Sequence, residues 1–323
     1  MKRITILVPC YNEEAVLPIF YMKLCEIVKN MDCYSRYQFF VLFVDDGSDD
    51  KTLEIMKQLH SHNHNVSYLS LSRNFGKEVA MLAGMDYVDS DAVIIMDADL
   101  QDPPDLIPQM ICEWEQGYNS VYAKRRSRNG ETWMKKMTAH IYYRIYASLT
   151  HMPDTVDVGD FRLLDRQCIE ALRTIRERER YTKGLFNWIG YRQKAVLYDR
   201  PPRKYGNTKW TYWRLIHLAL EGVTSFSTIP LHISSWLGMI VSACSFIYTI
   251  FIVMRTLIYG GDVPGYPSLV AIILFVGGVQ LIVLGIIGEY LGRIFKESKR
   301  RPAYLIDEFN GDKVYGNKAE PLL

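Results

Sequence analysis

The sequence has no Cys-x-x-Cys pair and almost no excess of either charge. Its six cysteines are widely spaced, which argues against a zinc site and a disulfide framework and predicts a reduced, cytosol-facing catalytic part. The 38 Lys and Arg residues nearly balance the 36 Asp and Glu residues, which leaves a net charge of +2. The chain therefore has no overall attraction for polyanions, and we expect no nucleic-acid partner.

Two common phosphate-binding motifs are also missing. No Gly-x-Gly-x-x-Gly follows the first apolar run, and no Gly-x-x-x-x-Gly-Lys-[Ser/Thr] occurs anywhere in the chain. These absences exclude a dinucleotide fingerprint and a P-loop. A phosphate ligand would have to be held by a metal ion and by basic side chains instead.

What the N-terminal part does contain is an alternation of short apolar runs and helix-like stretches. Short buried strands joined by helical crossovers predict an α/β fold with a doubly wound, mostly parallel sheet. We expect strands near residues 4–8, 39–44, 66–71, 92–96 and 120–123, and helices near residues 13–28, 51–59 and 77–87. Ligands of such sheets bind beyond the carboxyl ends of the strands, so the residues after each strand are the candidates for a site.

Two long runs without a charged residue lie in the last third of the chain, at 233–254 and 263–288. Each can cross a hydrocarbon core of about 30 Å as a helix, and we predict spans at about 233–257 and 265–288. A pair of buried core helices is the alternative. Residues 259–262, which connect the two spans, include no Lys or Arg, and Arg255 lies near the outer end of the first span, whereas several basic residues follow the second run. The positive-inside rule therefore places both termini in the cytoplasm.

The chain is accordingly expected to have three parts. Residues 1–228 would form a cytoplasmic catalytic domain, residues 229–292 a two-helix transmembrane region, and residues 293–323 a cytoplasmic C-terminal tail. Basic and apolar residues are mixed at about 132–149 and 210–224, as in basic amphipathic helices that lie on an anionic membrane surface. Packing against the sheet is an equal alternative for the first of these stretches, and the membrane is favoured for the second.

Paired carboxylates follow the fourth expected strand. Asp97 and Asp99 are two residues apart and can both reach one divalent ion, for which hard oxygen ligands indicate Mg²⁺ or Mn²⁺. Such a pair is more often a solvated turn. The residues from Gln101 onward and the second acidic strand end at Asp45 and Asp46 favour a metal and diphosphate site.

Six short motifs occur in order along the chain: VPCYNEE (8–14), VDDGSDDKT (44–52), SRNFGKE (72–78), MDADLQDPP (96–104), GDFRL (159–163) and RKYGNTK (203–209). Together they resemble the family 2 glycosyltransferases of GT-A fold that act on polyprenyl phosphates. Within that group the chain is most similar to the bactoprenol glucosyltransferases, and more distantly to the dolichol-phosphate mannose synthases.

The resemblance implies a role for individual residues. Those implied to bind the nucleotide-sugar are Pro9, Tyr11, Glu13, Val44, Asp46, Asp97, Ala98, Gln101 and Arg125. Those implied to hold the metal are Asp97, Asp99 and Gln101, and those implied to take part in catalysis or to bind phosphate are Asp99, Asp160, Arg203 and Lys209. Asp160 matches a position that is acidic in some relatives and not in others, so the resemblance does not make it an obligatory base.

The implied reaction is transfer of one hexose, with glucose expected, from a UDP-sugar to undecaprenyl phosphate with inversion at the anomeric carbon. It would take place at the cytoplasmic face of a bacterial inner membrane and supply a lipid-linked sugar for cell-envelope glycans such as O-antigen. The alternatives are another sugar (N-acetylglucosamine, galactose, or mannose from GDP) and a non-catalytic membrane protein that binds nucleotide-sugars. Besides membrane lipids, a second copy of the chain is an expected partner, because small-residue faces such as Gly277-Gly278 and Gly285/Gly288 lie in the second span.

Overall fold

In the computed structural model the chain divides into two compact units. The first contains Met1–Ala219 and Arg301–Leu323, and the second contains Leu220–Arg300. The structure describes residues 1–31, 34–126, 158–178, 180–198, 229–259 and 265–314. The two predicted surface helices at 132–149 and 210–224, together with Arg203 and Lys209, lie outside the described residues.

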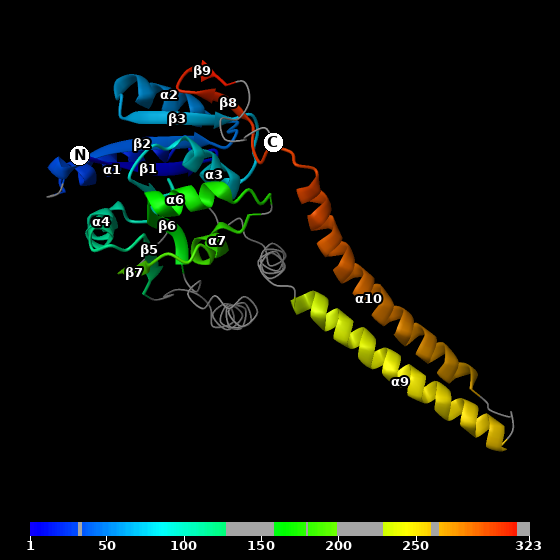
Figure 1. Ribbon diagram of the computed structural model, residues 1–323. Helices are drawn as coiled ribbons and strands as arrows, with labels where there is room; N and C mark the ends of the chain where they lie inside the picture. The colour runs from blue at the N-terminus through cyan, green and yellow to red at the C-terminus, as the bar shows by residue number, and fades with distance from the viewer. Residues whose placement is uncertain (32–33, 127–157, 179, 199–228, 260–264, 315–323) are drawn as a thin grey trace. The chain divides into compact units, whose positions relative to one another are not determined.

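A mixed sheet forms the centre of the first unit (Figure 1). Among the described residues its strand order is β7-β5-β6-β4-β1-β2-β3-β8-β9. The strands are β1 (Lys2–Cys10), β2 (Tyr37–Asp45), β3 (Val66–Leu71), β4 (Ala92–Ile95), β5 (Ser120–Arg125), β6 (Val158–Asp165), β7 (Gln193–Tyr198), β8 (Ile306–Phe309) and β9 (Asp312–Lys313). Strands β4, β1, β2 and β3 are parallel, which confirms the predicted α/β class.

Antiparallel strands flank this parallel centre on both sides. Strand β6 lies between β4 and β5 and is antiparallel to both, and β8 is antiparallel to β3. We predicted neither β6 nor β8. Strand β6 brings Asp160 and Arg162 to the sheet beside β4, because Arg162 is opposite Ile95 in the register.

Helices cover both faces of the sheet. The helices are α1 (Leu17–Lys29), α2 (Thr52–His62), α3 (Lys77–Tyr87), α4 (Ile107–Glu115), α6 (Arg166–Thr174) and α7 (Thr182–Trp188), with short 3-10 turns η1 (Tyr34–Arg36) and η2 (Pro104–Leu106). One face packs Ile4 and Ile6 of β1 against Phe20 and Leu24 of α1, in a core that also takes residues of α2 and α4.

On the other face α3 packs closely on β1 and β2. A Cβ atom at Gly84 of α3 would lie 2.2 Å from Leu7 Cδ1 and 2.9 Å from Val44 Cγ2, so a larger residue would force these buried side chains or the helix to shift. This contact sets the depth of α3, whose first residue is Lys77. The packing of α3 thus places that lysine at the carboxyl edge of the parallel strands.

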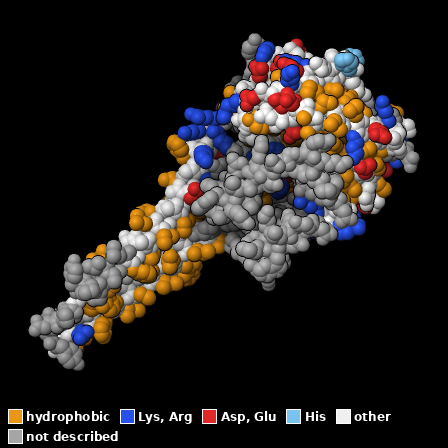
Figure 2. Space-filling model, turned by 180° about the vertical axis from the view of Figure 1, so that it is seen from behind, with side chains coloured by type: hydrophobic (Ala, Val, Ile, Leu, Met, Phe, Trp, Pro, Cys, Tyr) orange, Lys and Arg blue, Asp and Glu red, His pale blue; other side chains and the backbone are white. Residues whose placement is uncertain are grey.

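The second unit has two long helices, α9 (Ile229–Tyr259) and α10 (Tyr266–Ser298). Both are long and apolar enough to cross a membrane, over Leu231–Ile252 and Phe275–Ser298, and the most apolar window of each stretch contains no buried residue among those that the structure describes. Figure 2 shows hydrophobic side chains exposed along the helices. The prediction of two apolar helices in this part of the chain is confirmed.

The chain returns to the first unit after α10. We expected only a tail from residue 293, but strand β8 pairs with β3, in the register Leu69 to Phe309 and Ser70 to Glu308. Here the chain covers what would be an open strand edge, and open edges expose unpaired backbone groups. In Figure 1 the red strands β8 and β9 lie beside β3.

Candidate active site

The loops after the parallel strands meet at the carboxyl edge of the sheet. The loop after β1 is tied to the loop after β2, because Asn12 donates its amide to Ser48 Oγ at 3.0 Å and accepts the Asp49 amide at 2.9 Å. The Glu13 amide donates to Thr52 Oγ1 at 2.8 Å. These bonds hold the predicted nucleotide-binding segments of β1 and β2 as one structure.

Asp46 connects the loop after β2 to the loop after β3. Its two carboxylate oxygens accept the backbone amides of Phe75 (2.7 Å) and Gly76 (2.9 Å). Burial raises the pKa of Asp46, and the two amide hydrogen bonds oppose that rise. These two hydrogen bonds of the carboxylate therefore hold residues 75 and 76 in place, while its predicted contact with the nucleobase stays a prediction.

Gly47 allows these two loops to touch. Its φ is +67°, and a Cβ there would lie 2.4 Å from the carbonyl carbon of Arg73 and 2.6 Å from the Asn74 amide nitrogen. Both obstacles are backbone atoms that cannot rotate away. Glycine is consequently required for this loop contact by conformation and by space.

Lys77 joins two carboxylates from different strands. Its Nζ lies 2.6 Å from Asp97 Oδ1, just beyond β4, and 2.6 Å from Asp160 Oδ2 in β6. Although burial favours the neutral amine, Asp97 and Asp160 raise the pKa of Lys77 above its usual value. Burial likewise opposes ionisation of Asp160, but Lys77 and Lys183 hold the pKa of that carboxyl well below its usual range. Both groups are charged at neutral pH.

The predicted site residues did not include Lys77. It stands in the motif at 72–78, and its position as the first residue of a helix was the available signal, because helix dipoles disfavour cations there. What could not be read from the sequence is its partner Asp160, which is 83 residues away.

A buried charged layer lies next to Asp160. Arg162 is 2% exposed, and its guanidinium carbon lies 3.6 Å from the ring centre of Phe186 in α7. Burial lowers the pKa of Arg162 to about 10. Glu78 Oε2 accepts the Thr182 amide at 3.1 Å. Sequence analysis did not name Arg162 and Glu78 as site residues, although they stand in the motifs at 159–163 and 72–78.

Asp99 and Gln101 follow Asp97 on the same loop. The Gln101 amide donates to Asp99 Oδ1 at 3.1 Å, and Leu100 between them has a φ of +57°. Gln101 is 7% exposed. The loop thus turns sharply directly after the paired carboxylates.

The donor set suits a magnesium or manganese ion that is only partly held by protein. Asp97 and Asp99 supply hard carboxylate oxygens, and the described residues contain no group of three or more acidic, His or Cys side chains that could hold a metal by themselves. Mg²⁺ typically takes one or two carboxylates and completes its shell with water and substrate phosphates. The residues fit such a site.

The remaining predicted residues are spread along the same edge. Pro9, Tyr11 and Glu13 lie at and beyond the end of β1, Val44 and Ala98 are buried, and Arg125 is the last residue of β5. Tyr11 is 43% exposed, which leaves its ring available to a ligand. The structure brings Asp97 and Asp160 together, because both carboxylates contact Lys77. Arg125 lies apart from them, at the end of β5.

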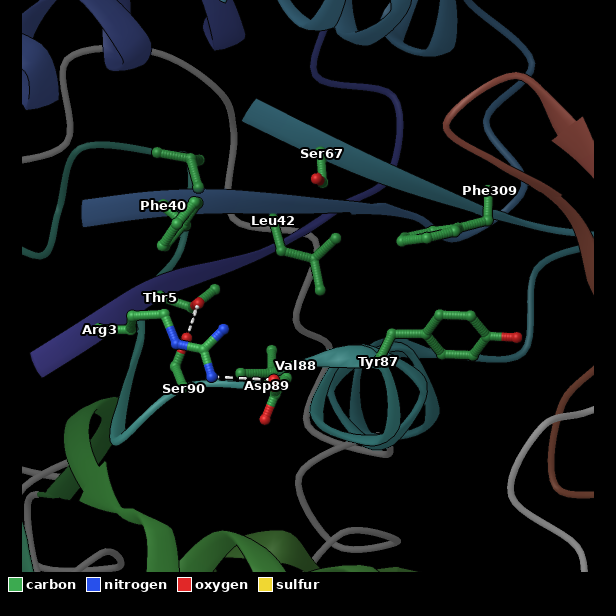
Figure 3. A pocket seen from close by; sticks show the side chains of 11 residues that line it. Arg3, Thr5, Phe40, Leu42, Ser67, Tyr87, Val88, Asp89, Ser90 and Phe309 are labelled. Atoms are coloured by element: carbon green, nitrogen blue, oxygen red, sulfur yellow. Dashed lines mark hydrogen bonds and ion pairs between the residues drawn. The ribbon is translucent and has the colours of Figure 1, made fainter. Parts of the chain in front are cut away.

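A pocket of about 150 Å³ lies elsewhere, near the amino ends of the parallel strands (Figure 3). Two pairs of its polar side chains bond each other, since Arg3 donates to Asp89 at 2.9 Å and Thr5 lies 2.6 Å from Ser90. Parallel sheets bind their ligands at the opposite edge. We therefore assign the functional site to the carboxyl edge.

Comparison with known proteins relates the chain to one family. The family model described as glycosyl transferase family 2 matches residues 5–173. An uncharacterised glycosyltransferase of Synechocystis is 47% identical over 95% of this chain and 96% of its own length. The bactoprenol glucosyl transferase of Shigella phage SfV is 42% identical, and the prophage bactoprenol glucosyl transferase homolog of Escherichia coli K12 is 41% identical, each over 94% of this chain and 98% of its own length.

Among solved structures, glucosyl-3-phosphoglycerate synthase from Mycobacterium tuberculosis is similar at 17% identity, with a TM-score of 0.48. That structure was solved with Mn²⁺, UDP and phosphoglyceric acid. The similarity covers 70% of this chain and 77% of that one.

Proposed function

The chain belongs to glycosyl transferase family 2, and we propose that it transfers one glucose from a UDP-sugar to undecaprenyl phosphate at the cytoplasmic face of the membrane. The observation that carries the proposal is the similarity to bactoprenol glucosyl transferases at 41–42% identity over 94% of the chain, a span that includes both apolar helices. Glucose as the sugar rests on the names of these relatives, and UDP as the nucleotide rests on the family resemblance of the sequence motifs.

The carboxylates at the end of β4 would hold the donor. Asp97 and Asp99 are the residues that would bind Mg²⁺ or Mn²⁺, with Gln101 beside them, and the bound ion would neutralise charge on the departing diphosphate. Lys77 would keep Asp97 oriented and would add positive charge next to the departing diphosphate. Pro9, Tyr11, Glu13, Val44, Asp46, Ala98 and Arg125 are proposed to contact the nucleotide-sugar.

The acceptor needs little help from a base. A phosphate monoester has a second pKa near 6, so its oxygen is mostly unprotonated at pH 7. That oxygen would form a bond to the anomeric carbon while the bond from this carbon to the diphosphate oxygen breaks, and UDP leaves with the electron pair. In-line attack inverts the configuration.

Asp160 then has a positioning role in this reaction. Its carboxylate is held ionised by Lys77 and Lys183, and an anion with so low a pKa is a poor proton acceptor at neutral pH. Arg203 and Lys209 are proposed to bind phosphate and to reduce the repulsion between the two anionic reactants.

The membrane helices would keep the enzyme where its lipid acceptor is. The apolar stretches of α9 and α10 fit a membrane core by length, and the basic residues that follow α10 favour a cytoplasmic C-terminus. We propose that both termini and the first unit are cytoplasmic, in a bacterial inner membrane.

The decisive experiment is product formation with defined substrates. The purified full chain is incubated with undecaprenyl phosphate, Mn²⁺ or Mg²⁺, and UDP-glucose, UDP-galactose, UDP-N-acetylglucosamine or GDP-mannose, and the lipid phase is analysed by mass spectrometry. We expect a lipid one hexose heavier with UDP-glucose, and chelation of the metal should abolish it.

Two variants make the result specific. Asp99→Asn should lose the product, while Asp91→Asn, which changes an exposed carboxylate before the amino end of β4, should keep it. Product formation with another donor alone would correct the sugar, and donor binding without any lipid product would favour the non-catalytic alternative.

A further inference from the structure

The C-terminal segment, residues 301–314, reaches the candidate active site through backbone contacts. The Ser72 amide, which directly follows β3, donates to the Leu305 carbonyl at 2.9 Å. Ser72 is the last residue before the loop 73–76. In this loop the backbone amides of Phe75 and Gly76 donate to Asp46. The segment therefore holds the start of a loop that ends at Lys77.

The same segment also holds the far end of α3. Tyr304 is 2% exposed and donates its hydroxyl to Asp86 Oδ2 at 2.6 Å. Arg176 binds both oxygens of Asp86, at 2.6 and 3.0 Å. The ring of Phe309 packs on Tyr87, with 5.0 Å between ring centres. Contacts from residues 304–309 thus fix both the loop before α3 and the last turn of that helix.

Further contacts anchor the segment to β3 and α2. Glu308 pairs with Lys57 at 2.8 Å and accepts the hydroxyl hydrogen of Tyr68. The Asn310 side chain accepts the Tyr68 amide at 2.8 Å. These charged and buried bonds make the segment an integral part of the domain, although it follows the second apolar helix in the chain.

We propose that the C-terminal segment is a positioning element of the active site, with Tyr304 and Leu305 as its acting residues. It holds the loop 73–76 and helix α3, and through them it sets Asp46 against the nucleotide-binding loops and Lys77 against Asp97 and Asp160. The chain runs from the end of α10 at Ser298 to Tyr304 without an intervening element, so the site depends on the part of the chain that continues directly from the second apolar helix. The inference rests on the proposed function only for the identity of the nucleotide.

Amide hydrogen exchange tests this without any substrate. In the full chain, the Ser72 amide exchanges only when its bond to Leu305 opens, and the Phe75 and Gly76 amides exchange only when the loop leaves Asp46. Tyr304→Phe removes one hydrogen bond to a carboxylate and keeps the ring. We expect all three amides to exchange about tenfold faster in Tyr304→Phe, because a hydrogen bond to a charged group is lost at the anchor.

The matched control is Asp307→Asn. It breaks the pair of Asp307 with Lys313, which lies within the β8–β9 hairpin, and it should leave exchange at 72–76 unchanged. Faster exchange at Ser72 with unchanged exchange at Phe75 and Gly76 would overturn the proposal, since the segment would then detach without moving the loop. Equal exchange at all three amides in Tyr304→Phe and the parent chain would overturn it as well.

A ligand readout extends the test. Tyr304→Phe should bind UDP with Mn²⁺ about threefold to tenfold more weakly than the parent chain, and Asp307→Asn should bind it as the parent does. Tyr304→Phe should likewise raise the donor KM about threefold to tenfold and leave the acceptor KM unchanged. If the parent chain binds no UDP but its loop amides respond as expected, the proposed function fails while the positioning role stands. If the parent binds UDP and Tyr304→Phe does not weaken that binding, the positioning role is wrong.

Discussion

Lys77 combines an unfavourable helix position with two close carboxylates. The amide groups at a helix N-terminus carry partial positive charge, so a lysine at the first helical position is stabilised only if nearby anions outweigh the dipole. Asp97 and Asp160, each 2.6 Å from Nζ, provide those anions. Removing the lysine would leave two like charges facing each other beside the proposed metal site.

We expect Lys77→Met to lower kcat about 100-fold, because misplacement of a reacting group by about 1 Å is sufficient for such a loss. Turnover of UDP-glucose with undecaprenyl phosphate measures it. The control is Arg166→Gln, which removes another cation that pairs with a carboxylate, Asp89 at 2.9 Å, before the amino end of β4. A kcat in Lys77→Met as high as in the control would show that the lysine has no part in the reaction.

Gly47 provides a second test at the level of single residues. Gly47→Ala should weaken UDP binding by about 100-fold or more, since its Cβ would lie 2.4 Å from the Arg73 backbone and would separate the two loops. Gly117→Ala separates the clash from the backbone strain: Gly117 also has a positive φ, +91°, but the nearest atom to its Cβ would be 4.0 Å away. Calorimetric titration with UDP compares the two, and equal affinities would rule out the required loop contact.

Strand β8 belongs to the sheet of the first unit although it follows the second apolar helix in the chain. It is only four residues long, and it pairs with β3, which is far from it in the sequence. Its Glu308 also accepts a hydrogen bond from Lys57 of α2, 251 positions away. The hydrogen bonds from Lys57 and Tyr68 lower the pKa of Glu308 below its usual 4.5. A carboxyl whose pKa is lowered by folding stabilises the folded state above its unfolded pKa and loses that contribution as the pH falls through its folded pKa.

Glu308→Gln should therefore reduce thermal stability in a pH-dependent way. At pH 7 we expect the melting midpoint to fall by about 2–4 °C, which corresponds to about 1 kcal/mol in a domain of this size. The difference from the parent chain should shrink as the pH is lowered below 4.5, and it should vanish once Glu308 is protonated in the folded state too. A difference that is constant between pH 7 and pH 3.5 would mean that the ion pair with Lys57 is not its source.

At the scale of the whole molecule, the two apolar helices and the basic residues after them lead to a topology that can be measured. A cysteine introduced by Gly261→Cys, in a chain whose other cysteines are replaced by serine, should react with a membrane-impermeant maleimide added to whole cells. Cys112, which is exposed on the first unit, should react only after the inner membrane is opened when it is the single cysteine left. The reverse pattern would place the first unit outside the cytoplasm.

Much of the parallel core follows from short-range pattern. Apolar runs near 4–8, 39–44, 66–71 and 92–96 predict β1 to β4, and the polar residues after them predict the edge where Asp46, Asp97 and Asp99 lie. The lengths of the charge-free runs likewise predict α9 and α10. Period and run length depend on neighbouring residues, so one chain is sufficient to read them.

The antiparallel strands and the partners of Lys77 depend on the tertiary structure. Strand β6 is inserted beside β4, and this insertion decides that Asp160 meets Lys77 and that Arg162 is buried against Phe186. Strand β8 is likewise placed by the free edge of β3, which any short strand of suitable register can cover. Strand pairing over such separations depends on backbone hydrogen bonds and on the space left at a sheet edge. Neither leaves a recognisable pattern in the neighbouring residues of the sequence.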